Sequence, residues 1–156
     1  MARVNVGVNP KYLADQHLIA ESVEITMITG GLRKNGYVIK SHVPSKFKLG
    51  TGHINFFKNK IRYLNARLLE VNVEMVNRGF KPGTYLTLSE YPDKLVNNWN
   101  PDNDASSIIR SRIVERLKSP LNGKKGGDYY RYRSKLIGED MDKFCNMLMR
   151  SELHSV

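Results

Sequence analysis

Apolar residues recur at helical spacing in four parts of the chain. The clearest case lies between residues 52 and 78, where the apolar positions are alternately four and three residues apart: Phe57, Ile61, Leu64, Leu68, Val71 and Met75. Such a stripe is typical of an amphipathic helix that buries its apolar face. The pattern predicts one long helix from about Gly52 to Arg78. Gly79, directly after it, is suited to the left-handed conformation that ends many helices.

Two shorter helices are predicted on either side of this long one. The first is expected at about residues 15–29, with Asp15 as its N-terminal cap and Gly30-Gly31 as its end. The other is expected at about residues 104–118, because the sequence Ser119-Pro120 cannot continue a helix. Its apolar stripe consists of Ile109, Ile113 and Leu117.

A fourth helix is expected near the end of the chain, at about residues 139–153. One of its faces carries Met141, Phe144, Cys145, Leu148 and Met149. The connections between the helices are irregular, and strands do not alternate with helices, so a parallel sheet is not expected. The predicted fold class is mostly α: a single compact domain of three main helices with long irregular connections, plus an extra C-terminal helix.

Composition narrows the class of protein. The chain has 156 residues, which fits one domain. It contains no apolar run of the about 20 residues that a membrane-spanning helix needs. The single cysteine, Cys145, excludes an internal disulfide and a cysteine-rich zinc site. We expect no metal and no cofactor. The first ten residues lack the apolar core of a signal peptide, so we expect a cytoplasmic protein, in the host cell if phage-encoded.

The charge is strongly basic and unevenly distributed. Lys and Arg number 25 against 15 Asp and Glu, a net charge of +10. Residues 35–70 hold seven bases and one acid, and residues 105–135 hold nine bases and two acids. Clusters of this kind favour a polyanionic partner, nucleic acid first, because each neutralised phosphate releases counterions. Two solvated helix faces are the alternative.

The first predicted helix carries the candidate chemistry. At 100° per residue, His17, Glu21 and Glu24 fall on one face. Two carboxylates beside an imidazole would repel DNA unless one of them has a chemical role. The alternatives are a solvated face or a Glu21–His17 pair one turn apart. Signatures of serine hydrolases, P-loop proteins, zinc proteases and dinucleotide-binding folds are absent from the sequence. The turn at residues 50–53 either seats a phosphate or simply begins a helix.

Several segments together resemble a known family. Residues 13–21, with the sequence LADQHLIAE, are followed three residues later by Glu24, and this resembles the signature of the phage pyrimidine-dimer DNA glycosylase/AP lyase family of the ultraviolet endonuclease V type. The family is also resembled by ARVN at residues 2–5, FKLGTGHINFF at 47–57, RGF at 78–80 and YYRY at 129–132. The resemblance spans about residues 2–135, dense up to residue 80 and looser beyond, so residues 1–135 would form the glycosylase/AP-lyase domain and 136–156 a helical extension of it.

The resemblance implies a mechanism. Family members remove a damaged pyrimidine, using the N-terminal α-amine as the nucleophile, and cut the strand by β-elimination through an imine. Here the amine would belong to Ala2 after removal of Met1, and Glu24 would stabilise the cationic sugar. The partner would be double-stranded DNA containing lesions or abasic sites, bound by a monomer. Positions that match the family's DNA contacts are Arg3, Gln16, His17, Arg33, Lys34, Arg112, Arg116, Tyr129, Tyr130, Arg131 and Tyr132.

The sequence departs from the family beside the candidate catalytic acid. Val23 and Met27 stand where the family has two arginines that contact DNA. Apolar neighbours of this kind can also raise the pKa of Glu24 by desolvation. The lesion that the protein recognises therefore stays open. The alternatives are a diverged paralogue acting on another damaged or modified base, and a non-catalytic DNA-binding protein on the same scaffold.

Overall fold

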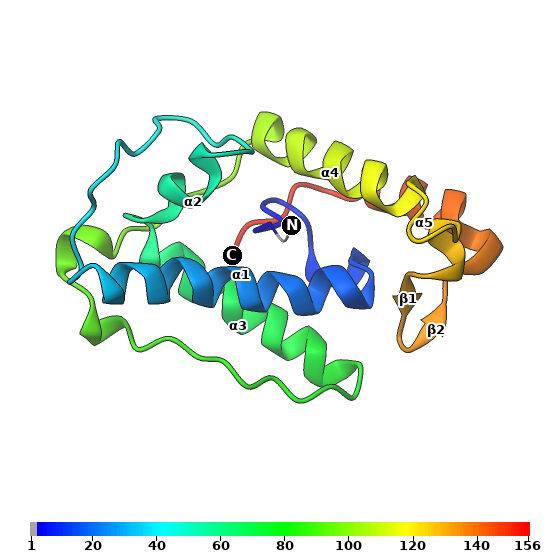
Figure 1. Cartoon of the computed structure of the whole chain (residues 1–156), viewed down its shortest axis with the longest axis horizontal. Helices are drawn as coiled ribbons and strands as arrows, with labels where there is room; N and C mark the ends of the chain where they lie inside the picture. Colours follow the sequence, from blue (N-terminus) through cyan, green and yellow to red (C-terminus); the bar gives the residue numbers. More distant parts are fainter. Residues whose placement is uncertain (1–2) are drawn as a thin grey trace.

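The computed structural model describes residues 3–156 and confirms a mostly α fold (Figure 1). Its α-helices are α1 Asp15–Lys34, α2 Gly52–Phe57, α3 Ile61–Asn77, α4 Asn103–Lys118 and α5 Met141–Arg150. A two-stranded antiparallel hairpin, which the helical periodicity does not predict, consists of β1 Arg131–Tyr132 and β2 Lys135–Leu136. Short 3-10 turns lie at Pro10–Tyr12, Leu88–Glu90, Asp93–Leu95, Gly126–Asp128 and Gly138–Asp140.

The helix α1 runs along the length of the molecule, with α3 packed against it and α4 across from it (Figure 1). The chain from residue 3 to residue 9 lies between α1 and α4. The C-terminal tail returns to this segment, where the amide of His154 donates to the carbonyl of Gly7 over 3.0 Å. The N-terminal segment is therefore an internal element of the fold.

An alternating pattern buries this N-terminal segment. Val4, Val6 and Val8 are all fully buried, at a spacing of two residues. Gly7 between them has a φ of +74°, and a Cβ added there would lie 2.7 Å from the Cβ of Ser106. Glycine at this position lets the chain turn against α4. The period of two is visible in the sequence and typical of an extended segment with one buried face.

The helix α1 is longer than predicted, and it is not capped by Asp15. Ala14 occupies the cap position, and the Asp15 carboxylate instead accepts hydrogen bonds from the Arg78 guanidinium and from the amides of Arg133 and Ser134. The predicted N-terminal cap is therefore wrong, because tertiary donors occupy that carboxylate.

The predicted end of α1 at Gly30-Gly31 is also wrong, since the helix continues to Lys34. Leu32, beyond the glycines, is buried in the core. Its burial stabilises the last turn against the unfavourable helix propensity of glycine.

The predicted long helix is broken into α2 and α3. The Lys60 ammonium donates to the carbonyl of Phe56 over 2.8 Å and lies 3.8 Å from the centre of the Phe56 ring, which caps the end of α2. The predicted apolar stripe still lies in the core on both sides of the break, and Gly79 ends α3 with a φ of +83°. Periodicity located the buried face correctly and missed the break, because the four-residue spacing from Phe57 to Ile61 continues across it.

The two C-terminal helices largely follow the sequence. In α4, Ile109, Ile113 and Leu117 are buried as predicted, and the Asp102 side chain caps the helix. The helix α5 is shorter than predicted, and on its predicted apolar face Cys145 and Leu148 are buried whereas Met149 is 46% exposed. None of the helices within residues 3–156 is both long and apolar enough to cross a bilayer.

Three buried arginines hold the chain together from inside. They are Arg67, Arg78 and Arg110. Arg110 donates to the carbonyls of Gly7, Leu148 and Glu152, which fastens the C-terminal tail to the N-terminal segment. Arg67 and Arg110 both belong to the basic segments of the sequence. Part of that positive charge therefore lies in the core and is not available to a polyanion.

Candidate active site

Glu24 lies in the middle of α1 and is almost completely buried. Burial raises the pKa of this carboxyl above its usual value, and the positive charge of Arg3 opposes the shift. The direction agrees with the expectation for apolar surroundings. The expected cause of the raised pKa was the apolar side chains of Val23 and Met27. They are 48% and 61% exposed, so they do not bury the carboxyl. Arg3 of the N-terminal segment is near enough to act on the Glu24 carboxyl electrostatically.

A narrow cavity of about 40 Å³ opens beside the N-terminal segment. Three elements meet there: the N-terminal segment, α1 and α4. The lining residues are Arg3, Asn5, His17, Ala20, Arg112, Ile113 and Arg116. Larger hollows of the surface lie elsewhere, for example one of about 520 Å³ beside Trp99, but they contain none of the predicted site residues. The cavity at Arg3 is thus where the structure brings predicted residues from distant parts of the chain together.

His17 presents a neutral imidazole to this cavity. Burial, with the positive charges of Arg116 and Arg112, lowers the pKa of His17 to about 4. Its ring lies 5.0 Å from that of Tyr130. The Nδ1 atom is buried and has no hydrogen-bond partner within residues 3–156. A buried ring nitrogen without a partner is uncommon in folded proteins and is suited to bonding a ligand.

Arg112 and Arg116 extend from α4 one turn apart. Arg112 is half-buried in the cavity wall, and burial together with the charges of Arg116 and Arg3 lowers its pKa. Arg116 is exposed. Three guanidinium groups thus converge on one small space. Such a concentration of positive charge attracts anions.

The aromatic-basic segment lies beside the first turn of α1. Both ends of the Gln16 amide bind it: the nitrogen donates to the carbonyl of Tyr129 over 2.8 Å, and the oxygen accepts from the amide of Arg131 over 3.0 Å. Gln16 therefore fixes the backbone of this loop. Its amide is occupied by these contacts.

The three tyrosines of this segment have different environments. Tyr129 is 38% exposed and meets Tyr130 edge-to-face. Tyr130 is buried against His17. Tyr132 is half-buried, donates its hydroxyl to the carbonyl of Lys11 and covers the Arg78 guanidinium. An exposed ring for stacking is offered by Tyr129, whereas the other two rings pack against the protein.

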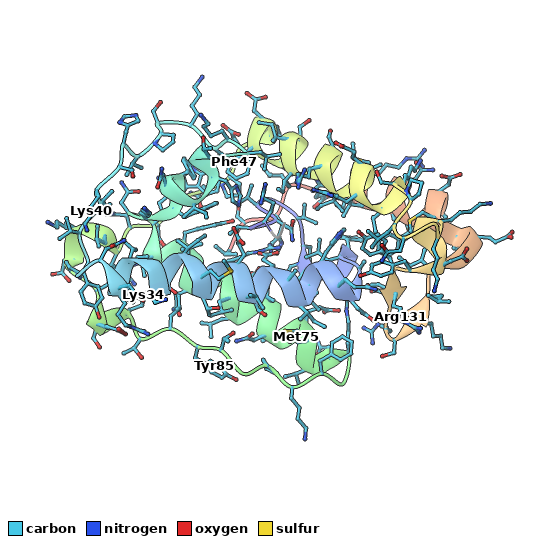
Figure 2. All side chains as sticks on the ribbon, viewed as in Figure 1. Lys34, Lys40, Phe47, Met75, Tyr85 and Arg131 are labelled. Atoms are coloured by element: carbon cyan, nitrogen blue, oxygen red, sulfur yellow. The ribbon has the colours of Figure 1, made fainter. Side chains whose placement is uncertain are left out.

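Arg33 and Lys34 lie at the opposite end of α1 from Arg131 (Figure 2). The Arg33 guanidinium forms a bidentate ion pair with Glu90, which also accepts from the hydroxyl of Tyr37. Lys34 is exposed. The structure therefore separates these two residues from the cavity at Arg3.

The contacts of Glu21 give it a structural role in the core. Its carboxylate is fully buried and forms a bidentate ion pair with Arg67, at 2.5 and 3.0 Å. It also accepts from the side-chain amide of Asn5 over 2.8 Å. The alternative of a Glu21–His17 pair is wrong, because Arg67 and Asn5 occupy the carboxylate.

Two residues at the site were not among the predicted ones. Asn5 lines the cavity and ties the N-terminal segment to Glu21. His53, buried at the start of α2, accepts a hydrogen bond from the amide of Val4. The sequence carried one signal for His53, its place in a segment that resembles the family. Ala2, the predicted nucleophile, lies outside the described residues. Within residues 3–156, no three His, Cys, Asp or Glu side chains are grouped as metal ligands would be.

Comparison with protein families supplies the decisive observation. The model of the family described as pyrimidine dimer DNA glycosylase matches residues 1–87. The chain belongs to this family. The matched part covers more than half of the 156 residues and contains Glu24, Glu21 and the N-terminal segment.

Membership assigns a DNA-repair glycosylase function to the protein, with DNA containing damaged bases as its substrate. The matched region ends before α4. The assignment of the two α4 arginines to the site therefore rests on the resemblance and on their place in the cavity with Arg3. That of the aromatic-basic segment rests on the resemblance and on its contacts with Gln16 and His17. The part of the chain that this pyrimidine dimer DNA glycosylase shares with its family contains the N-terminal segment, α1, α2 and α3.

Proposed function

We propose that the protein is a pyrimidine-dimer DNA glycosylase that also cuts the strand as an AP lyase, through an imine on its N-terminal amine. After removal of Met1, the nucleophile is the α-amine of Ala2. Such an amine has a pKa of about 7.7–8.0, so a useful fraction is unprotonated near neutrality. The observation that carries the proposal is the position of Glu24, buried on α1 and within the electrostatic reach of Arg3, the residue after Ala2.

The chemistry proceeds in balanced steps. The amine nitrogen attacks C1′ of the damaged nucleotide, the glycosidic bond breaks, and its electron pair leaves with the base, which takes up a proton. The sugar ring opens and the amine becomes a protonated imine with C1′. A base then removes a proton from C2′, the C3′–O bond breaks and the 3′ phosphate leaves. Water finally hydrolyses the imine and releases the amine.

Glu24 supports two of these steps. As a carboxylate it stabilises the positive charge that develops on the sugar, and this stabilisation is strong in a buried site. Its raised pKa also brings the carboxyl closer to the range in which it can accept and return a proton. Both roles suit a group shielded from water, and an exposed glutamate would supply neither as well.

The surrounding groups are suited to hold the DNA. Arg3, Arg112 and Arg116 supply three positive charges around the cavity for phosphates. The unpartnered Nδ1 of His17 can bond the sugar or a phosphate oxygen. Tyr129 offers an exposed ring on which a base can stack. Access to C1′ requires the duplex to bend and a nucleotide to leave the stack, which a lesion makes less costly.

A second lesion class is favoured by one observation. Val23 and Met27 lie one turn apart on α1 and place exposed apolar surface beside Glu24, where a dimer-specific enzyme of the family has arginines. An apolar rim contacts bases better than phosphates. The second candidate is therefore a glycosylase/AP lyase for another damaged or modified base, with the same nucleophile and acid.

Borohydride trapping on two duplexes tests the proposal, because borohydride reduces an imine to a stable adduct. One duplex carries a pyrimidine dimer and the other an abasic site. Adducts on both support the dimer enzyme, and an adduct on abasic DNA alone supports the second candidate. Adducts on neither overturn both proposals in favour of a non-catalytic DNA-binding protein. Mass spectrometry of the trapped N-terminal peptide must show Ala2 as the modified residue. Acetylation of that amine must abolish the adduct.

A further inference from the structure

The N-terminal segment is held by a histidine that the mechanism above does not use. The Nε2 atom of His53 accepts a hydrogen bond from the backbone amide of Val4, 3.1 Å away. The other ring nitrogen, Nδ1, lies 3.3 Å from the carbonyl of Lys48. His53 is 1% exposed, so water does not compete for either contact. A side chain 49 residues away in the sequence thus fixes the backbone near the start of the chain.

One tautomer of the ring satisfies both contacts. Nδ1 carries the hydrogen and donates to the carbonyl of Lys48, which leaves the Nε2 lone pair to accept from Val4. A protonated ring would have no acceptor for the Val4 amide. Burial, with a smaller contribution from the charge of Arg3, lowers the pKa of His53 to about 4 and keeps the ring neutral at physiological pH.

Aromatic side chains border the ring on two sides. Phe47 meets it edge-to-face at 5.5 Å between ring centres, and Phe57 does so at 5.3 Å. Phe47 makes this contact from the irregular segment before α2, where Figure 2 labels it. These rings enclose His53 in the core, and its two hydrogen bonds set the orientation of the imidazole.

The Val4 amide that His53 binds lies close to the predicted nucleophile in the sequence. Val4 is two residues after Ala2, a span of about 7 Å of extended chain. Asn5, the next residue, is fixed by its hydrogen bond to Glu21. A nucleophile on a short tether can reach its target only from a limited volume, and misplacement by about 1 Å can cost 10²-fold in rate.

We propose that His53 is a positioning residue, which acts through the Val4 amide to place the N-terminal nucleophile beside Glu24. The inference rests on the proposed function, since it requires the Ala2 amine to react. It assigns to the turn at residues 50–53 a role other than seating a phosphate: this turn delivers the His53 ring to the N-terminal segment.

Two amide substitutions of His53 separate positioning from folding. In His53→Gln the side-chain oxygen can reach the place of Nε2 and accept from Val4. In His53→Asn the shorter side chain reaches only the place of Nδ1. Both variants lose the aromatic ring and add the same polar group. Phe47→Leu is the matched control, because it loosens the packing around His53 without removing the acceptor.

The measurement is the single-turnover rate of borohydride-trapped adduct formation on an abasic duplex, with binding to a tetrahydrofuran abasic analogue and the melting temperature measured in parallel. We expect His53→Asn to lower the rate about 10²-fold. His53→Gln should stay within about tenfold of the wild-type protein, and Phe47→Leu should keep the wild-type rate despite a lower melting temperature. Binding of the unreactive analogue should change by less than threefold in all three variants.

Two results would overturn the inference while leaving the proposed function intact. One is equal rates for the Asn and Gln variants. The other is a loss in Phe47→Leu as large as that in His53→Asn, which would attribute the effect to general loosening. If the wild-type protein forms no adduct on abasic DNA, the proposed function itself fails, and the role of His53 fails with it.

Discussion

Glu21 and Glu24 lie three residues apart on α1, both are buried, and the structure treats them in opposite ways. Glu21 is neutralised by Arg67 in a bidentate ion pair and is also hydrogen-bonded to Asn5. Glu24 has Arg3 as a charged neighbour, and burial raises its pKa. The Glu21 carboxylate is occupied by contacts that hold the fold together. Glu24 is the carboxyl that we propose takes part in the chemistry.

The arginines divide in the same way. Arg67 in the core donates to a carboxylate and to the carbonyl of Val8, so its charge is fully matched. Arg112 and Arg116 face the cavity, where like charges lower the pKa of Arg112. The core arginine is matched by a carboxylate, whereas the cavity gathers several positive charges beside one another. Titratable groups whose pKa is shifted by neighbouring charges are concentrated at functional sites. Five predictions test this division, from the largest expected effect to the smallest.

Glu24→Gln should lower strand cutting by at least about 10³-fold, because it removes the negative charge that stabilises the developing cation. Cutting is measured in single turnover on abasic and on dimer-containing duplexes. Binding to an abasic analogue should be largely unchanged, since no phosphate contact is lost. Full cutting by this variant would remove Glu24 from the mechanism.

The same variant should be more stable than the wild-type protein at pH 7. A folded-state pKa that is raised by burial makes the carboxylate form costly above that pKa, and glutamine avoids the cost. Below the ordinary value of about 4.5 both folded and unfolded states bind the proton, and the difference should vanish. Urea unfolding at pH 7 and at pH 4 checks the sign.

Arg67→Met should lower the free energy of unfolding by about 3–5 kcal/mol, because it leaves the buried Glu21 carboxylate without its partner. The measurement is urea unfolding at pH 7, followed by the fluorescence of Trp99. The double variant Arg67→Met with Glu21→Leu should recover much of the loss, as a buried ion pair is replaceable by apolar groups. A single variant as stable as the wild-type protein would mean that the ion pair does not hold the core.

Arg112→Gln and Arg116→Gln should each lower affinity for abasic duplex and reduce the slope of log K against log salt by about one. The matched control is Arg33→Gln, whose charge is already paired with Glu90 at the far end of α1. Fluorescence anisotropy at several salt concentrations measures the slope. Equal losses at Arg33 and Arg116 would contradict the assignment of DNA binding to the cavity.

Val23→Arg and Met27→Arg should have the smallest effect. Each adds a charge to the exposed rim of the site, so the salt slope should rise by about one for each substitution. Preference for dimer over abasic DNA should rise with it if these positions contact the strand around the lesion. An unchanged slope would show that this rim does not face the phosphates. Thr26→Arg, half-buried on the same helix between the two, is the positional control.

Sequence periodicity predicted the buried faces well and the helix boundaries less well. The stripe from Phe57 to Met75 is in the core as predicted, although the helix breaks within it. The break depends on the Lys60 ammonium folding back onto Phe56, a contact that a hydrophobic pattern does not encode. Gly30-Gly31 failed to end α1 for a similar reason, since burial of Leu32 outweighs local propensity.

The sequence predicted which residues belong to the candidate site, but not which contacts each of them makes. The motif around Glu24 pointed to the family from sequence alone, and the family comparison confirms it. Gln16, His17 and Tyr130 were all predicted as DNA contacts. In the structure Gln16 fixes a loop, Tyr130 packs against His17, and His17 keeps an unpartnered nitrogen at the cavity.

By itself the sequence determined the family and the helical class and singled out Glu24 as the candidate acid, because these depend on local order: a motif, a period and a spacing. Only the tertiary structure decided which of two neighbouring carboxylates is neutralised and which basic residues lie in the core. It also decided that His53 holds the start of the chain. Electrostatic pairing and desolvation depend on groups brought together from distant parts of the chain, and these distances exist only after folding.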